Sequence, residues 1–101
     1  MNADAVRDCL EIIGNGTDIR GEQVLYRLAE AILEARRKHP VFADGIYQAL
    51  GRVGAEYGEL VQAVEKLEST ERMETEALHL MVTTVRLLNR EHETHGGEKA
   101  R

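Results

Sequence analysis

Four successive segments of the chain place apolar residues at helical spacing, and Pro40 is the only proline in the sequence. These segments cover about residues 3–13, 22–38, 44–67 and 71–90. Asp44 and Thr70 are candidate N-caps for the last two, and residues 14–18 have the composition of a turn. No segment shows the alternation of a strand. The sequence therefore predicts an all-α fold, with three main helices and an N-terminal helix.

The length and composition indicate a single domain. The chain has 101 residues, of which 43% are hydrophobic, enough for one modest core and too few residues for two. Residues 92–101 contain Gly96 and Gly97 and lack apolar periodicity. We therefore predict one all-α domain over residues 1–91 and a disordered tail over residues 92–101.

The charge balance argues against nucleic acid as a partner. Thirteen basic and eighteen acidic residues leave a net charge of -5, so there is no basic excess to hold a polyanion. No apolar run approaches the length of a membrane span, and the N-terminus carries no signal-peptide pattern. The single cysteine, Cys9, cannot form an intramolecular disulfide. These features together predict a cytoplasmic protein with no membrane contact.

The last predicted helix has a narrow polar stripe and a broad apolar arc. Each residue turns a helix by about 100°, so five polar residues of this segment fall within one stripe roughly 80° wide. The stripe consists of Glu76, His79, Thr83, Arg86 and Arg90. An ordinary surface helix has the reverse pattern, so this helix needs more apolar contact than three helices of one chain supply. We therefore expect a homo-oligomer, a dimer or a tetramer, that completes a helical bundle.

The third predicted helix carries a carboxylate on its apolar face. Glu56 shares that face with Ala49, Val53 and Leu60, and Glu59 lies at its boundary. A carboxylate in such a place must be paired, protonated or bound to a cation. The sequence leaves two interpretations open, a buried salt bridge to a nearby arginine (Arg52 or Arg86) and a cation site.

A second polar pair supports the cation site. Glu76 and His79 have the same i, i+3 spacing on the next helix as Glu56 and Glu59 on theirs. Two such pairs on adjacent helices can converge on one point. Three carboxylates crowded there would repel one another unless a divalent cation lay among them.

These residues bring a known family to mind. Two runs carry the resemblance: Ala55-Glu56-Tyr57-Gly58-Glu59-Leu60 and Glu76-Ala77-Leu78-His79. Together they resemble the EExxE and ExxD motifs of the MazG-like all-α nucleoside triphosphate pyrophosphohydrolases. Residues 37–42 also resemble the lead-in to the acidic helix in some members, and the resemblance covers about residues 22–90.

The resemblance implies a reaction and a set of site residues. Glu56 and Glu59 match the second and last glutamates of EExxE, and Glu76 matches the glutamate of ExxD. In the family these carboxylates hold Mg²⁺ against a triphosphate, and water attacks the α-phosphorus to give a nucleoside monophosphate and pyrophosphate. The resemblance thus implies a nucleotide substrate, with Glu56 and Glu59 as catalytic residues.

The sequence departs from the family pattern at two positions. Ala55 replaces the first glutamate of EExxE, and His79 replaces the aspartate of ExxD. Magnesium prefers oxygen ligands, whereas imidazole suits transition metals better. The predicted ligand set of Glu56, Glu59, Glu76 and His79 therefore fits Mg²⁺ by resemblance, or Mn²⁺ or another transition metal because of His79.

The basic residues have two interpretations each. Arg86 and Arg90 follow His79 on the polar stripe, where they would hold phosphate oxygens or form salt bridges back to Glu76 or Glu56. Lys38 would reach a triphosphate tail or interact with the C-terminus of its own helix.

Two functions follow from these patterns. The first is a metal-dependent MazG-like nucleotide pyrophosphohydrolase, which the three retained acids and the arginine stripe favour. The alternative is a catalytically silent helical homo-oligomer of the same fold with a binding or regulatory role, which Ala55 and His79 favour.

Overall fold

The computed structural model describes residues 2–14 and 21–93. Its elements are α1 (Ala3–Gly14), α2 (Gly21–Lys38), α3 (Ile46–Glu65), α4 (Thr70–Leu88) and the short 3₁₀ helix η1 (Glu91–Glu93). The described residues form helices and no strand, which confirms the all-α prediction. None of the described helices combines the length and the apolar character needed to cross a membrane.

Contacts divide the chain into two compact units, residues 1–30 and 31–101. The first unit contains α1 and the first part of α2. Helix α1 begins where Asn2 Oδ1 accepts a hydrogen bond from the Ala5 amide at 2.8 Å, and none of its residues is buried. The second unit contains the last turns of α2 together with α3, α4 and η1.

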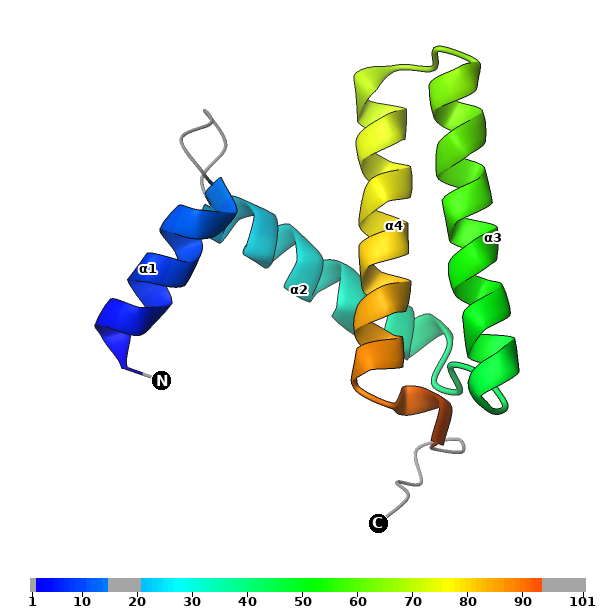
Figure 1. The fold of residues 1–101 in the computed structure, drawn as a ribbon, viewed down its shortest axis with the longest axis horizontal. Helices are drawn as coiled ribbons and strands as arrows, with labels where there is room; N and C mark the ends of the chain where they lie inside the picture. The colour runs from blue at the N-terminus through cyan, green and yellow to red at the C-terminus, as the bar shows by residue number, and fades with distance from the viewer. Residues whose placement is uncertain (1, 15–20, 94–101) are drawn as a thin grey trace. The chain divides into compact units, whose positions relative to one another are not determined.

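Helices α3 and α4 form the centre of the second unit. They lie side by side and run in opposite directions (Figure 1). Ala49 and Ala63 are buried on the inner face of α3, with Val53 and Leu60 half-buried between them, as the helical periodicity predicted. Small residues at both ends of this face allow the two helix backbones to pack closely.

The N-caps of α3 and α4 differ from the predicted ones. Gly45, not Asp44, precedes α3, with a φ of 89° that glycine adopts without steric cost. Ser69, not Thr70, caps α4, because its Oγ accepts a hydrogen bond from the Arg72 amide at 3.1 Å. Each cap lies one residue from its predicted position, and the order of the helices is unaffected.

The connection from α2 to α3 contributes to the core. Phe42 and Ala43 are buried there with Ala49 of α3, and Leu87 of α4 packs against them. This short segment is therefore anchored by burial. It places the end of α2 beside the α3–α4 pair.

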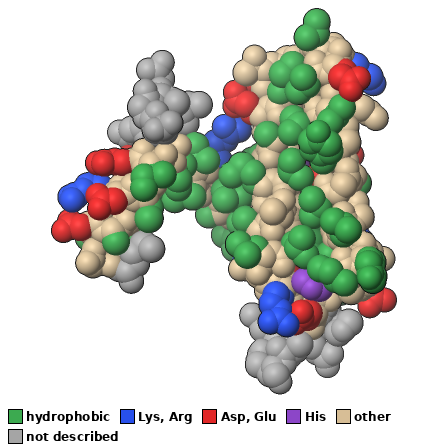
Figure 2. All heavy atoms as spheres, viewed as in Figure 1, with side chains coloured by type: hydrophobic (Ala, Val, Ile, Leu, Met, Phe, Trp, Pro, Cys, Tyr) green, Lys and Arg blue, Asp and Glu red, His purple; other side chains and the backbone are tan. Residues whose placement is uncertain are grey.

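The outer face of α3 remains exposed in the single chain. Tyr47, Leu50 and Tyr57 are 87%, 59% and 58% exposed. Figure 2 shows hydrophobic side chains gathered over α3 and α4 on the face turned to the viewer. An oligomer would cover this exposed apolar surface. Self-association therefore stays a prediction, and substitutions on this surface can test it.

The C-terminal end of the described chain includes two residues that the sequence assigned to the tail. His92 and Glu93 belong to η1, and His92 is only 8% exposed. The buried imidazole of His92 anchors this turn. The turn is not visible in the sequence, because it has no apolar periodicity. Residues 94–101 of the predicted tail, and residues 15–18 of the predicted turn, lie outside the described residues.

Candidate functional site

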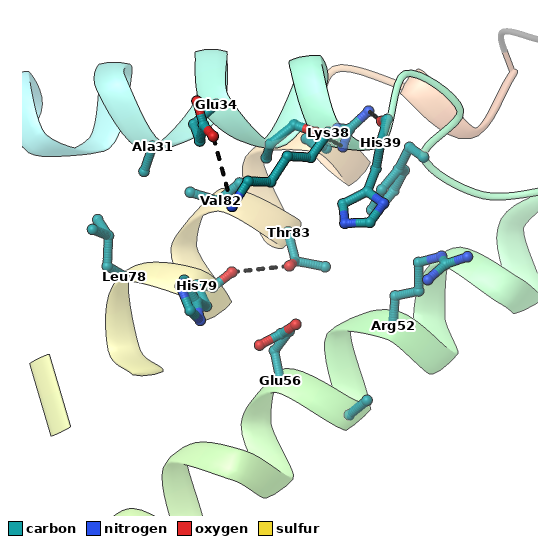
Figure 3. A pocket seen from close by; sticks show the side chains of 14 residues that line it. Ala31, Glu34, Lys38, His39, Arg52, Glu56, Leu78, His79, Val82 and Thr83 are labelled. Carbon is teal, nitrogen blue, oxygen red and sulfur yellow. Dashed lines mark hydrogen bonds and ion pairs between the residues drawn. The ribbon is translucent and has the colours of Figure 1, made fainter. Parts of the chain in front are cut away.

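A pocket of about 450 Å³ lies within the second unit, among the end of α2, α3 and α4 (Figure 3). Phe42, Leu78 and Val82 supply part of its apolar lining. Its polar lining residues are Glu34, Lys38, His39, Arg52, Glu56, His79, Thr83 and Arg86. The polar stripe of α4 thus faces the pocket through His79, Thr83 and Arg86.

Glu56 reaches the pocket from the inner face of α3. The residue is half-buried, and its Oε2 is buried without a hydrogen-bond partner among the described residues. Burial raises the pKa of the Glu56 carboxyl, and the adjacent Glu59 carboxyl, close enough for hydrogen bonding, raises it further. His79 opposes this change and Glu76 adds to it. An unpartnered oxygen of this kind is a site for a cation or for the hydrogen of a ligand.

Glu76 lies on α4, one turn before His79, and both of its carboxylate oxygens have partners. Its side chain is only 2% exposed, and Oε2 accepts a hydrogen bond from Arg72 Nη2 at 3.3 Å. Its Oε1 lies 3.2 Å from Nδ1 of His79. Glu76 therefore orients the His79 ring, which is half-exposed at the pocket wall.

The structure brings only part of the predicted metal ligands together. Glu56 and His79 line the pocket, and Glu76 lies 3.2 Å from His79, whereas Glu59 and Glu76 are not among the lining residues. No group of three His, Cys, Asp or Glu side chains in the described ranges is arranged to hold a metal. The oxygens of Glu76 already face Arg72 and His79.

A smaller ligand set fits a hard cation better. Proteins often bind Mg²⁺ through one or two carboxylates, with water and substrate phosphates as the other ligands. Glu56, whose Oε2 has no hydrogen-bond partner among the described residues, supplies one such carboxylate, and Glu59, one turn further along α3 but outside the pocket lining, is the candidate for the second. The residues present therefore fit Mg²⁺ bound together with a phosphate ligand.

Arg86 pairs with neither Glu76 nor Glu56, the two acids that the sequence offered as salt-bridge partners. Its Nε donates to Glu91 Oε1 at 2.8 Å, and its Nη2 donates to the carbonyl oxygen of His39 at 2.8 Å. A longer contact of 3.5 Å joins Nη1 to the carbonyl oxygen of Ala35, and the guanidinium lies 5.0 Å from the Phe42 ring centroid. With 4% exposure, Arg86 connects α4 to the end of α2 and leaves little of its guanidinium for a ligand.

Glu91 completes this connection. It also accepts hydrogen bonds from Arg36, the shortest at 2.6 Å from Nη2. Burial acts to raise the pKa of the Glu91 carboxyl, but the hydrogen bonds from Arg36 and Arg86 outweigh burial, and the pKa is lowered. Glu91 is therefore the ionised partner shared by two arginines.

The other two predicted substrate-binding residues have different positions. Arg90 follows the end of α4 with a φ of 60°, pairs with Glu93 at 2.9 Å, and is not among the pocket residues. Lys38 does line the pocket, where its Nζ lies 3.6 Å from Glu34 Oε1. Helical extrapolation to Arg90 failed because α4 ends at Leu88.

Sequence reasoning did not assign a ligand-binding role to two basic groups of the pocket, Arg52 and His39. Arg52 lies one turn before Glu56 on α3, and His39 directly precedes Pro40. The i, i+4 spacing of Arg52 and Glu56 is a signal in the sequence, which names Arg52 only as a candidate salt-bridge partner of Glu56. Glu56 forms no ion pair with Arg52 or Arg86 within the described ranges.

Comparison of the chain with known protein families, with curated proteins and with solved structures finds no match.

Proposed function

We propose that this protein is a metal-dependent nucleotide pyrophosphohydrolase of the MazG-like kind. It would hydrolyse a nucleoside triphosphate to the monophosphate and pyrophosphate. The observation that carries the proposal is the buried Oε2 of Glu56, which no described residue hydrogen-bonds, in a pocket that also contains Arg52, His39 and Lys38. Such a pocket suits a ligand that has both a cation-binding end and anionic groups.

Glu56 and Glu59 are the proposed catalytic residues and the proposed holders of Mg²⁺. The cation would neutralise charge on the phosphate oxygens, as divalent ions do in phosphoryl transfer. A carboxylate of the pair accepts a hydrogen bond from the attacking water, so that the new bond joins the water oxygen to the α-phosphorus. The bond from that phosphorus to the bridging oxygen breaks, pyrophosphate leaves, and the water proton passes through the carboxylate to solvent.

His79 is an additional ligand in this proposal, and Glu76 orients its ring. Glu76 Oε1 lies 3.2 Å from His79 Nδ1, so Nε2 is the nitrogen of His79 that this contact leaves for a metal. An available imidazole nitrogen favours Mn²⁺ or another transition metal over Mg²⁺ as its partner. The metal preference of the protein therefore depends on whether His79 takes part.

A catalytically silent homo-oligomer with a binding or regulatory role is the second candidate. Ala55 in place of an acid, and the lack of a three-residue metal group among residues 2–14 and 21–93, favour it. Both candidates use the same pocket, and they differ in whether a bond is broken there.

A pyrophosphate-release assay distinguishes the two candidates. A panel of nucleoside triphosphates is tested with Mg²⁺, Mn²⁺ or Zn²⁺, using wild type, Glu56→Gln and the matched control Glu65→Gln at the exposed end of α3. We expect release by wild type and the control, and a loss of about 100-fold or more in Glu56→Gln, as for other removed electrostatic groups. Absence of release from every nucleotide and metal pair would favour the silent oligomer.

A further inference from the structure

Most of the basic groups around the pocket are already engaged with acids or carbonyl oxygens. Arg86 donates to Glu91 and to the His39 carbonyl, and Arg36 donates to Glu91. Lys38 lies beside Glu34, at 3.6 Å. The pocket cations that sequence patterns assigned to substrate are therefore already partnered.

Arg52 and the imidazole of His39 differ from these groups. Both line the pocket, and neither side chain forms a hydrogen bond or ion pair with another residue in the described part of the chain. In Figure 3 they come from different elements and lie on the same side of the pocket, with Glu56 between Arg52 and His79. Two unengaged nitrogen-bearing side chains thus flank one end of the cavity.

We infer that Arg52 and His39 form an anion subsite that binds a phosphate group at the end of the pocket remote from His79. The guanidinium of Arg52 offers a planar pair of donors that matches two phosphate oxygens. The inference deepens the proposed function, and it rests on that function for the ligand being an oligophosphate. In that setting Arg52 and His39 hold the part of the ligand that leaves as pyrophosphate.

The backbone of the subsite is positioned before any ligand arrives. Arg86 Nη2 donates to the carbonyl oxygen of His39 at 2.8 Å, and the buried Phe42 anchors the same connection three residues later. Arg52 is in the second turn of α3, whose start is packed through the buried Ala49. Because both supports are held by buried contacts, little backbone ordering is required when a phosphate binds.

The test is a calorimetric titration of the full chain with inorganic tripolyphosphate, without metal and at fixed ionic strength. The variants are Arg52→Gln and the matched control Lys66→Gln, which removes the same charge at the other end of α3. We expect Arg52→Gln to bind about tenfold or more weakly, as a lost charge-assisted pair predicts, and Lys66→Gln to bind within about twofold of wild type. Equal binding by Arg52→Gln and wild type, or no binding by wild type, would overturn the inference.

Two further measurements separate this inference from the proposed function. His39→Gln should also weaken tripolyphosphate binding, and thermal melting checks that each variant is folded. If tripolyphosphate binding depends on Arg52 but no nucleotide releases pyrophosphate, the subsite stands and the proposed function fails. If pyrophosphate release is found and Arg52→Gln leaves KM unchanged, the function stands and the subsite is wrong.

Discussion

Arg86 of α4 donates a hydrogen bond from Nη2 to the carbonyl oxygen of His39, at 2.8 Å, just after the end of α2. The last carbonyl groups of a helix lack partners within the helix, so a buried donor from a neighbouring element stabilises them. Glu91 balances the charge of Arg86, at 2.8 Å. Arg86 therefore connects α2, α4 and η1. It also holds the backbone of His39, which lines the pocket.

Replacement of Arg86 by methionine should destabilise the protein strongly. The substitution removes a buried cation that is 4% exposed and leaves Glu91 and the His39 carbonyl without this donor. We expect a loss of about 3–5 kcal/mol in the free energy of unfolding, as for a broken buried ion pair, measured by urea denaturation. The exposed Arg37, which pairs with Glu34, is the control, and Arg37→Met should change stability by less than about 1 kcal/mol.

The Arg86 prediction has a second variant. Lysine at position 86 keeps the charge but lacks the planar donor pair, so Arg86→Lys should restore only a small part of the lost stability. A methionine variant as stable as wild type would show that the contacts of Arg86 with Glu91 and His39 contribute nothing to folding.

Replacement of Glu56 by glutamine should stabilise the metal-free protein at neutral pH. A carboxyl with a raised folded-state pKa contributes stability below its ordinary value of 4.5, and loses that contribution as pH rises through the folded-state pKa. Ionisation of Glu56 is therefore less favourable in the folded protein than in the unfolded chain, and glutamine removes both the burial of charge and the repulsion from Glu59. Thermal melting should show a higher Tm for Glu56→Gln at pH 7, with the difference shrinking as pH falls below 4.5.

Glu65→Gln is the matched control for this pH series, since Glu65 lies at the exposed end of the same helix. It should leave the Tm close to that of wild type. A Glu56→Gln variant that melts below wild type at pH 7 would mean that the Glu56 carboxylate has a stabilising partner.

Replacement of His79 by aspartate should increase Mg²⁺ affinity. Aspartate would supply an oxygen ligand at position 79, as in the ExxD motif that this segment resembles, and Mg²⁺ prefers oxygen. Without metal the new charge lies beside the buried Glu76, so like-charge repulsion should lower the Tm. Bound Mg²⁺ should then raise the Tm of His79→Asp more than that of wild type.

Calorimetric Mg²⁺ titration and melting with and without Mg²⁺ measure these two effects. His79→Asn, which introduces no charge, is the control for the loss of the imidazole. A less stable His79→Asp variant that binds Mg²⁺ no better than wild type would count against a metal-ligand role at this position.

The protein should be an oligomer at micromolar concentration. The outer face of α3 exposes Tyr47, Leu50 and Tyr57, while Gly54 and Gly58 leave open space where a second helix could approach closely. Light scattering across a dilution series should report a dimer or a tetramer. A folded, soluble monomer throughout the series would contradict the prediction.

A substitution on this face tests where the subunits meet. Leu50 is 59% exposed, so Leu50→Glu should leave the fold of one chain intact and shift the mass towards that of a monomer. The control is Gln48→Glu. Gln48 is exposed on the same helix, but its side chain is on a different face from those of Tyr47, Leu50 and Tyr57. An unchanged mass for Leu50→Glu would place the interface elsewhere.

The helices and the position of Glu56 could be predicted from the sequence, because both depend on local periodicity. Apolar residues every three or four positions defined α2 and α3 to within two residues of their observed ends, and Glu56 fell on the inner face of α3 as the helical wheel placed it. The observed N-caps each lie one residue from the predicted ones. Gly45 and Asp44, like Ser69 and Thr70, are adjacent residues with similar preference for the N-cap position. Arg90 was misplaced because α4 ends before it.

The sequence by itself determined an all-helical chain with acids spaced to meet on neighbouring helices, since a residue's direction on a helix follows from its number. Only the tertiary structure decided what each side chain meets there. Arg86 pairs with Glu91 and the His39 carbonyl, whereas the side chain of Arg52 lies at the pocket with no hydrogen-bond or ion-pair partner in the described part of the chain. These choices depend on contacts between residues far apart in the sequence, such as Arg86 and Ala35, which are 51 positions apart. Such contacts arise from packing, which no local pattern encodes.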